Sequence, residues 1–199
     1  MERSVRTRLL EAAYTCIGRY GMGKTTVEDV AREAGVSRAT VYRHFPGGRD
    51  ELMREVIGWE TTRFFLRLAD AVAGIHDFAD LLEEALLYAH EAVERHAVLQ
   101  QVLATEPERL LPTLTVESGR ICRQIGEFLV PYLEAAPRRR PEVGAPQAAD
   151  YIARMLLSWI GAPGRWDLTD RDQVRGLVRA EFLAGVLLDD ETKRGLPSH

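Results

Sequence analysis

The stretch TVEDVAREAGVSRATVYRHF, residues 26–45, decides the fold of the N-terminal part of the chain. Its first half places small apolar residues at helical spacing before Gly35, and its second half places Val36, Val41 and Phe45 at helical spacing after it. Two short helices with apolar faces can therefore pack against each other across a sharp turn at the glycine. The stretch predicts a helix-turn-helix.

Capping residues fix the expected ends of these two helices. Thr25 followed by Glu28 reads as a capping box, in which a hydroxyl and a carboxylate satisfy free backbone amides at the start of the first helix. Ser37 is expected to cap the second helix, and Pro46 prevents that helix from continuing. Both predicted helices are short and well delimited.

The outward side of the second helix carries groups that can bind nucleic acid. Its side chains can bond phosphates or base edges, and Ala39 leaves room for a thymine methyl group or a close approach to the groove. The bonding residues on this side are Arg38, Thr40, Arg43 and His44. This chemistry suits the major groove of DNA.

The rest of the chain shows helical periodicity, with no run of alternating β-branched residues bounded by hairpin turns. We expect an all-α fold of about nine helices, with a DNA-binding domain at residues 1–49, its motif at 26–45, and a helical domain at residues 50–199. The proline-flanked loop 137–146, which contains three arginines, is expected to be a solvated connection, with a second DNA contact as the alternative. The other helices are expected at residues 5–20, 50–72, 77–95, 98–104, 115–136, 147–160 and 169–188.

Charge is distributed unevenly along the chain. The 199 residues carry a net charge of −4, but residues 1–49 hold nine Lys or Arg against five Asp or Glu, a net charge of +4, and the remainder has a net charge of −8. A basic N-terminal domain joined to an acidic body fits a phosphate-binding head. No segment approaches the roughly 18–20 apolar residues that a membrane span requires, and no signal peptide is evident, so we expect a cytoplasmic protein that does not bind membranes.

An enzymatic function is the first alternative. His90-Glu91 and His96 invite comparison with zinc proteases, but five residues separate the two histidines instead of the three that place paired histidines on one helix face. A His90–Glu94 pair is expected to be a surface contact, and Cys16 and Cys122 are expected to be buried free thiols. We predict no catalytic residue, no metal and no cofactor.

The N-terminal sequence resembles the TetR family of transcriptional regulators over residues 3–63; beyond that only helix order and length match the family's nine-helix plan. The resemblance rests on Thr25-Thr26, on the segment from Val30-Ala31 through Ala34-Gly35-Val36-Ser37, on residues 40–45, and on residues 49–52. Two departures are an arginine at position 49, where a lysine is common, and the flexible pair Gly47-Gly48.

The resemblance implies roles for individual residues. Thr25, Tyr42 and Arg49 would contact phosphates, while Arg38, Ala39, Thr40, Arg43 and His44 would face the groove; Thr26 and Ser37 complete the predicted DNA-binding set. Three alternatives stay open at this point. Tyr42 could be a core aromatic, His44 could instead hold its helix to a neighbour, and Arg3, Arg6 and Arg8 could form either an arm on the DNA backbone or a solvated start.

The resemblance also implies a homodimer that binds a palindromic operator as a repressor and is released by a small, largely apolar effector. The implied dimer interface lies on the last two helices, with Met155, Leu177, Phe182, Val186 and Leu187 as candidates. The implied effector chamber would be lined by Phe64, Phe65, Leu86, Tyr88, Leu103, Ile125, Phe128, Leu129 and Trp159. The alternative is a DNA-binding module that is regulated by a protein partner or by no effector.

Overall fold

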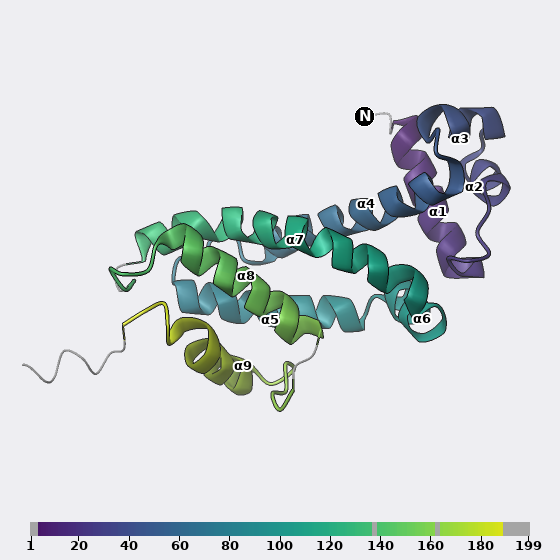
Figure 1. Ribbon diagram of the computed structural model, residues 1–199. Helices are drawn as coiled ribbons and strands as arrows, with labels where there is room; N and C mark the ends of the chain where they lie inside the picture. The colour runs from purple at the N-terminus through teal and green to yellow at the C-terminus, as the bar shows by residue number, and fades with distance from the viewer. Residues whose placement is uncertain (1–3, 137–138, 162–163, 189–199) are drawn as a thin grey trace, which may run out of the picture. The chain divides into compact units, whose positions relative to one another are not determined.

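The computed structural model describes residues 4–136, 139–161 and 164–188, without the side chains of 111–114, 116, 117 and 161. Over these ranges the chain is helical and forms no strand (Figure 1). The helices are α1 (Val5–Tyr20), α2 (Val27–Ala34), α3 (Arg38–His44), α4 (Gly48–Ala71), α5 (Phe78–Glu94), α6 (Ala97–Thr105), α7 (Pro107–Ala135), α8 (Ala145–Gly161) and α9 (Arg171–Leu177), which continues into the π-helical segment η1 (Val178–Leu183). The predicted all-α fold is confirmed.

The chain forms two compact units. The first unit contains Met1–Ala69 and Val93–Val116, and the second contains Asp70–Ala92 and Glu117–His199. Most of α4 and all of α6 therefore group with the N-terminal helices. The functional division after residue 49 is a different boundary, and it stays a prediction.

Helices α1, α2 and α3 pack around the apolar core of the first unit. Phe45, Val41 and Val30 are fully buried there. Val102 of α6 and Leu110 of α7 belong to the same core. The N-terminal three-helix head therefore shares its core with residues more than fifty positions further along the chain.

The start of α2 differs by one residue from its predicted position. Thr26, not Thr25, is the capping residue: its hydroxyl accepts a hydrogen bond from the Asp29 backbone N–H at 3.2 Å, and the Asp29 carboxylate accepts one from the Thr26 backbone N–H at 3.1 Å. The Thr26 hydroxyl also donates to Asp29 Oδ2 at 2.6 Å, and this hydrogen bond, followed by the one from the Thr26 backbone N–H, holds the pKa of the Asp29 carboxyl below its ordinary value. The predicted Thr25–Glu28 box is wrong because two threonines stand side by side and the second one carries the cap.

Two helices of the C-terminal part also differ from their predicted extents. Helix α7 begins at Pro107, not near residue 115. Proline fits the first position of a helix because the N–H that it lacks would have no acceptor within the helix there. Helix α9 ends at Leu177, and the π-helical segment η1 follows it. The single long helix predicted for residues 169–188 is thus two segments of different pitch.

Helices α1, α4 and α6 meet at a group of aromatic and charged side chains. Tyr14 lies edge-on to Trp59 and His96, with ring centroids 6.4 and 6.0 Å away. His96 Nδ1 accepts a hydrogen bond from the Leu99 backbone N–H in the first turn of α6 at 3.0 Å, and His96 Nε2 lies 3.5 Å from Glu60 Oε2. The Glu60 side chain is 16% exposed, so its carboxylate is held mainly by these neighbours.

The environment of Glu60 predicts a dependence of stability on acid. Burial raises the pKa of the Glu60 carboxyl, but the hydrogen bond with His96 and the charges of Arg63, His96 and Arg67 outweigh burial and lower it. A carboxyl with a lowered pKa stabilises the fold above its unfolded-state pKa, and that contribution disappears as the pH falls through the folded-state value. We expect the difference in unfolding free energy between wild type and Glu60→Gln to shrink through the acid range in urea titrations. A difference independent of pH would contradict this.

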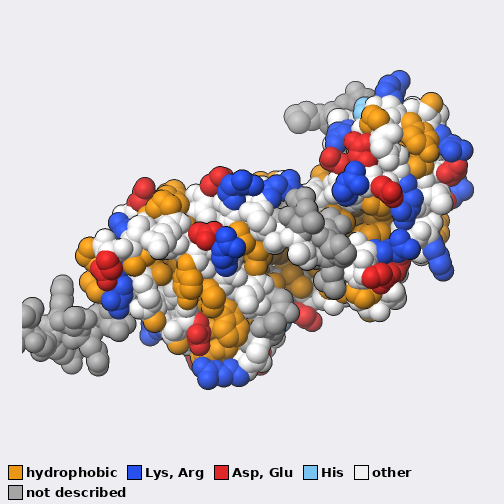
Figure 2. All heavy atoms as spheres, in the orientation of Figure 1, with side chains coloured by type: hydrophobic (Ala, Val, Ile, Leu, Met, Phe, Trp, Pro, Cys, Tyr) orange, Lys and Arg blue, Asp and Glu red, His pale blue; other side chains and the backbone are white. Residues whose placement is uncertain are grey.

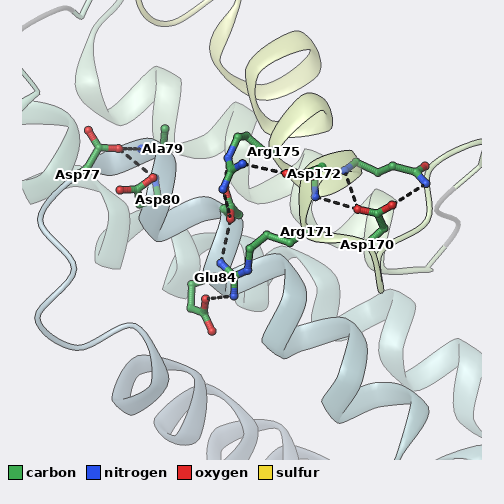
Figure 3. A network of polar contacts seen from close by, with 10 residues as sticks. Asp77, Ala79, Asp80, Glu84, Asp170, Arg171, Asp172 and Arg175 are labelled. Atoms are coloured by element: carbon green, nitrogen blue, oxygen red, sulfur yellow. Dashed lines mark hydrogen bonds and ion pairs between the residues drawn. The ribbon is translucent and has the colours of Figure 1, made fainter.

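In the second unit, a buried carboxylate joins α5 to α9. Glu83 is 4% exposed, and its two oxygens accept hydrogen bonds from Arg171 Nη1 at 2.8 Å and Arg175 Nε at 3.1 Å. Figure 3 shows both arginines pointing from α9 toward α5, where Arg171 also bonds Glu84 at 2.9 Å. This cluster of one carboxylate between two guanidinium groups fixes the start of α9 on α5.

Other contacts in the second unit hold α7, α8 and η1. Gly126 on α7 lies against the backbone of Ala149 on α8, at a spacing that a side chain would still fit. The Tyr151 hydroxyl donates to the Glu181 carbonyl at 2.7 Å. A cavity of about 770 Å³ lies at the start of α5, lined among others by Phe78, Tyr132 and Leu183.

Three further observations concern functions other than DNA binding. Cys16 and Cys122 are buried free thiols, as predicted. Among the described residues, no cluster of His, Cys, Asp and Glu side chains is arranged to hold a metal ion. No helix in the described part of the chain combines the length and the apolar character needed to cross a membrane.

Candidate nucleic-acid interface

Helix α3 is a short helix with a buried inner face and a capped start. The Ser37 hydroxyl accepts a hydrogen bond from the Thr40 backbone N–H at 3.2 Å, as predicted for the capping residue. Val41 within the helix and Phe45 directly after it are both 0% exposed. The turn before α3 is made by Gly35, whose φ of +66° lies in the left-handed region that favours glycine. The local sequence thus determines both the turn and which side of α3 faces inward.

Four predicted DNA-binding residues form an exposed surface, which we call the outer face of α3: Arg38, Ala39, Tyr42 and Arg43. Two more, Thr40 and His44, are half-buried at its edges. The Thr40 hydroxyl lies 3.0 Å from the Ser37 hydroxyl, so these two side chains already bond to each other. The outer face therefore offers two guanidinium groups, a phenol and a methyl group.

Arg38 is the member of the outer face with an ion-pair partner in another helix. Its Nη1 lies 2.6 Å from Glu28 Oε1 on α2, and both side chains are more than half exposed. Exposed pairs of this kind contribute about 0–1 kcal/mol, because water and salt screen them. Arg38 can therefore exchange this partner for a phosphate or a base at small cost.

Tyr42 lies on the surface, with 43% of its area exposed. Its ring packs beside Gly48, whose φ is +66°. A Cβ at that position would lie 3.2 Å from the ring carbon Cε1 of Tyr42, so the glycine lets the backbone pass close to the ring. The structure thus places the aromatic body of Tyr42 against the turn between α3 and α4 and does not place it in the core.

Two predicted phosphate contacts, Thr25 and Arg49, face inward. Thr25 is 0% exposed, and its hydroxyl donates to the Gly21 carbonyl at 2.8 Å. Arg49 Nε donates to the Thr25 carbonyl at 2.8 Å, and its Nη2 donates to the Met22 carbonyl at 2.5 Å. In this arrangement both residues hold the loop between α1 and α2, which presents Thr26 at the start of α2.

The same loop is held from a second side by a residue that the sequence did not single out. The Gly23 backbone N–H donates to Glu106 Oε2 at 2.6 Å, and the same carboxylate oxygen lies 3.0 Å from Arg109 Nε. Glu106 directly precedes α7, 83 positions after Gly23. No local pattern marks such a contact, because it depends on which distant segment packs beside the loop.

Lys and Arg side chains are spread over the surface of α1 to α3, with Asp and Glu among them, as Figure 2 shows for one face. Several carboxylates there are paired: Arg19 with Glu33 at 2.6 Å, and Arg32 with Asp29 at 2.5 Å. Arg43 lies on the exposed side of α3. The positive charge predicted for residues 1–49 is thus carried by a surface and not by the core.

The five predicted dimer residues fall into two groups. Leu177, Phe182 and Val186 are 0–3% exposed within the single chain, where they belong to the core of the second unit. Met155 and Leu187 are half-buried and retain exposed area. The sequence could not separate these groups, since an apolar residue on a terminal helix can serve a core or an interface equally well.

The nine residues predicted to line an effector chamber are divided between the two units. Phe64, Phe65 and Leu103 belong to the first, and the other six belong to the second. Leu86 and Leu129 are 0% and 2% exposed. None of the nine lines the cavity at the start of α5.

Comparison with known proteins identifies the head. Residues 9–56, which contain α2, the Gly35 turn and α3, match the profile described as bacterial regulatory proteins, tetR family. Residues 9–56 thus form a head of the TetR type. The relatives of the chain include the transcriptional repressor KstR2 of Mycobacterium tuberculosis, 31% identical over 110 residues that cover 54% of this chain and 53% of KstR2. They also include the regulator UidR of Escherichia coli, 25% identical over half of each chain.

Among solved structures, the TetR-family repressor AlkX of Dietzia sp. is similar to this chain with a TM-score of 0.62 and 26% identity, covering 88% of this chain and 92% of AlkX. The chain spans about half the length of the curated relatives that it matches. These proteins are named as regulators or repressors, and none is named as an enzyme. This agrees with the resemblance that the sequence shows to the TetR family.

Proposed function

We propose that this protein represses transcription by binding double-stranded DNA with the outer face of α3. The observation that carries the proposal is the division of α3 into a fully buried inner side, Val41 with Phe45, and an exposed side with two arginines and a tyrosine. A short helix of this kind, supported by a second helix across a tight turn, fits the major groove. The names of KstR2 and AlkX as repressors support the direction of regulation.

Different residues are proposed for base and phosphate contacts. Arg43 and Arg38 would bond base edges or phosphates, Ala39 would allow close approach to the groove, and the Tyr42 hydroxyl would bond a phosphate. Thr26 would present the start of α2 to the backbone, where free N–H groups favour an anion. In this proposal Thr25 and Arg49 do not contact the DNA; they hold the loop that precedes α2 in place. Ser37, Thr40 and His44 would support the edges of the same surface.

Replacing Arg43 by alanine tests the proposed interface. We expect the affinity for the preferred duplex to fall by about 1–3 kcal/mol, with relaxed preference at one or two base positions, because a bidentate contact to a base edge is lost. The preferred duplex comes from selection among random fragments, and fluorescence anisotropy at several salt concentrations gives the affinities. Arg123→Ala is the matched control, since it removes an exposed arginine from α7 in the second unit. Equal losses in both variants, or no loss in either, would refute the assignment.

We further propose that the protein acts as a homodimer built from α8 and the α9–η1 segment. Met155 and Leu187, and in addition Tyr151 with 42% of its area exposed, would supply the apolar contact, while Leu177, Phe182 and Val186 would support it from the core. Two copies of α3 would then read a palindrome whose half-sites lie about 34–36 Å apart or at a multiple of that spacing. Sedimentation of wild type and Met155→Asp tests this, since a charge in the interface should yield monomers.

An apolar effector is the proposed signal. AlkX is described as implicated in the biodegradation of n-alkanes, which supports testing hydrocarbons and other apolar compounds first. A ligand bound only by the native protein raises its unfolding temperature, and the rise grows with the logarithm of the ligand concentration once this exceeds Kd. A compound that raises this temperature and also lowers DNA affinity would support an effector. A panel without such a compound would favour regulation by a protein partner or by none.

A further inference from the structure

We infer that Arg6 and Arg8, in the first turns of α1, position the two helices of the helix-turn-helix, and that Arg6 fixes the orientation of α3. The sequence alone allowed these arginines to be an arm on the DNA backbone. The structure instead directs both guanidinium groups at protein carbonyls. The inference rests on the proposed DNA binding, because it concerns how the reading helix is held.

Each arginine binds the last residue of one helix. Arg8 Nη2 donates to the carbonyl of Ala34, the last residue of α2, at 2.6 Å. Arg6 Nη1 donates to the carbonyl of His44, the last residue of α3, at 3.1 Å. Carbonyls in the last turn of a helix lack partners within the helix, and the helix dipole favours a cation there. Because α2 and α3 have only eight and seven residues, these ends are a large part of each helix.

Arg6 has two further partners, which extend its contacts to α4. Its guanidinium carbon lies 4.6 Å from the centroid of the Phe45 ring, directly after α3. Its Nη2 bonds Glu55 Oε2 on α4 at 2.7 Å. One side chain of α1 thus contacts the carbonyl end of α3, the aromatic anchor of α3, and an acidic residue of α4. A change in any of these contacts would tilt the outer face of α3 without altering a residue on it.

The positioning role and the arm role predict opposite effects for one variant. Glu55→Gln removes a negative charge near the head, so an arm on the DNA backbone would bind all duplexes more tightly. If Glu55 instead holds Arg6 in place, the same variant weakens binding to the preferred duplex. Arg6→Lys keeps the positive charge but cannot make the same set of contacts, because an ammonium group lacks the planar fork of a guanidinium group.

The experiment measures affinity for the preferred duplex and for an unrelated duplex over a series of salt concentrations. It compares wild type, Arg6→Lys, Arg6→Ala, Glu55→Gln and the Arg6→Ala/Glu55→Gln pair. We expect each single variant to lose about tenfold for the preferred duplex, on the order of one charge-assisted hydrogen bond, and little for the unrelated one. The salt slope should stay unchanged, and the double variant should lose no more than Arg6→Ala. Circular dichroism checks folding, and Arg6→Lys serves if Arg6→Ala unfolds.

Two results would overturn the inference while leaving the proposed function intact. One is a salt slope that falls by about 1 in Arg6→Ala with equal losses for both duplexes, which marks a direct phosphate contact. The other is tighter binding of both duplexes by Glu55→Gln. If wild type itself prefers no duplex, the proposed function fails, and the inference fails with it.

Discussion

Replacing Phe45 by alanine is expected to lower the free energy of unfolding by about 3–5 kcal/mol, the range for removing a large buried side chain. Phe45 is 0% exposed and lies in the core that α1, α2 and α3 share. The Arg6 guanidinium also lies over the Phe45 ring. Alanine at position 45 would therefore remove both the buried packing of the ring and its contact with Arg6. Urea denaturation followed by circular dichroism measures the change.

Tyr42→Ala is the matched control for this prediction. Tyr42 is an aromatic residue of α3, three positions before Phe45, but is 43% exposed, so its removal should cost less than about 1 kcal/mol of stability. Phe45→Ala should therefore lower stability, whereas Tyr42→Ala should lower DNA affinity and leave the fold intact. Similar losses of stability in both would show that α3 has been assigned the wrong inner side. Phe45→Leu, which keeps most of the volume, permits DNA binding to be measured if the alanine variant does not fold.

Removing both arginines that hold Glu83 is expected to cost about 3 kcal/mol of unfolding free energy, because a buried carboxylate is left without its cationic partners. The Glu83 side chain is 6% exposed, whereas those of Arg171 and Arg175 are 54% and 43% exposed. The free-energy cost of burying a charge therefore falls mainly on the Glu83 carboxylate, because the two arginine side chains remain in contact with water. Urea denaturation of Arg171→Ala/Arg175→Ala measures this cost.

The background variant Glu83→Gln shows whether charge is the cause. In that background the same two substitutions should cost about 1 kcal/mol, since a neutral amide is less costly to bury than a charge. Equal costs in the two backgrounds would mean that the arginines stabilise the second unit by packing alone. The comparison uses differences between variants, so the reference value for the wild type cancels.

The sequence predicted the fold class and the helix-turn-helix because these depend on local patterns. The spacing of Val41 and Phe45, the glycine at position 35 and the serine at position 37 each act within one or two turns of helix. The structure confirms all of them. The error at the start of α2 was also local: either of two adjacent threonines could form a capping box with an acidic residue three positions later, and tertiary packing buries Thr25.

The features that the sequence did not reveal are contacts between residues far apart in the sequence. Arg49 faces the loop between α1 and α2, and Arg6 faces the end of α3, because carbonyl groups of other segments lie within reach. A carbonyl has the same chemistry in every residue, so the sequence gives no sign of which arginine will bind one. The same reason hid the core position of Phe182, whose type alone does not distinguish a core residue from an interface residue.

The hydrogen bond from the Gly23 backbone N–H to Glu106 has a consequence for the construction of chimeric regulators. The profile match ends at residue 56, so a designer would exchange the first 56 residues between two proteins. In this chain such an exchange would separate the loop before α2 from the carboxylate at position 106 and the head core from Val102 and Leu110. A grafted head should keep its DNA specificity only if residues 93–116 are transplanted with it.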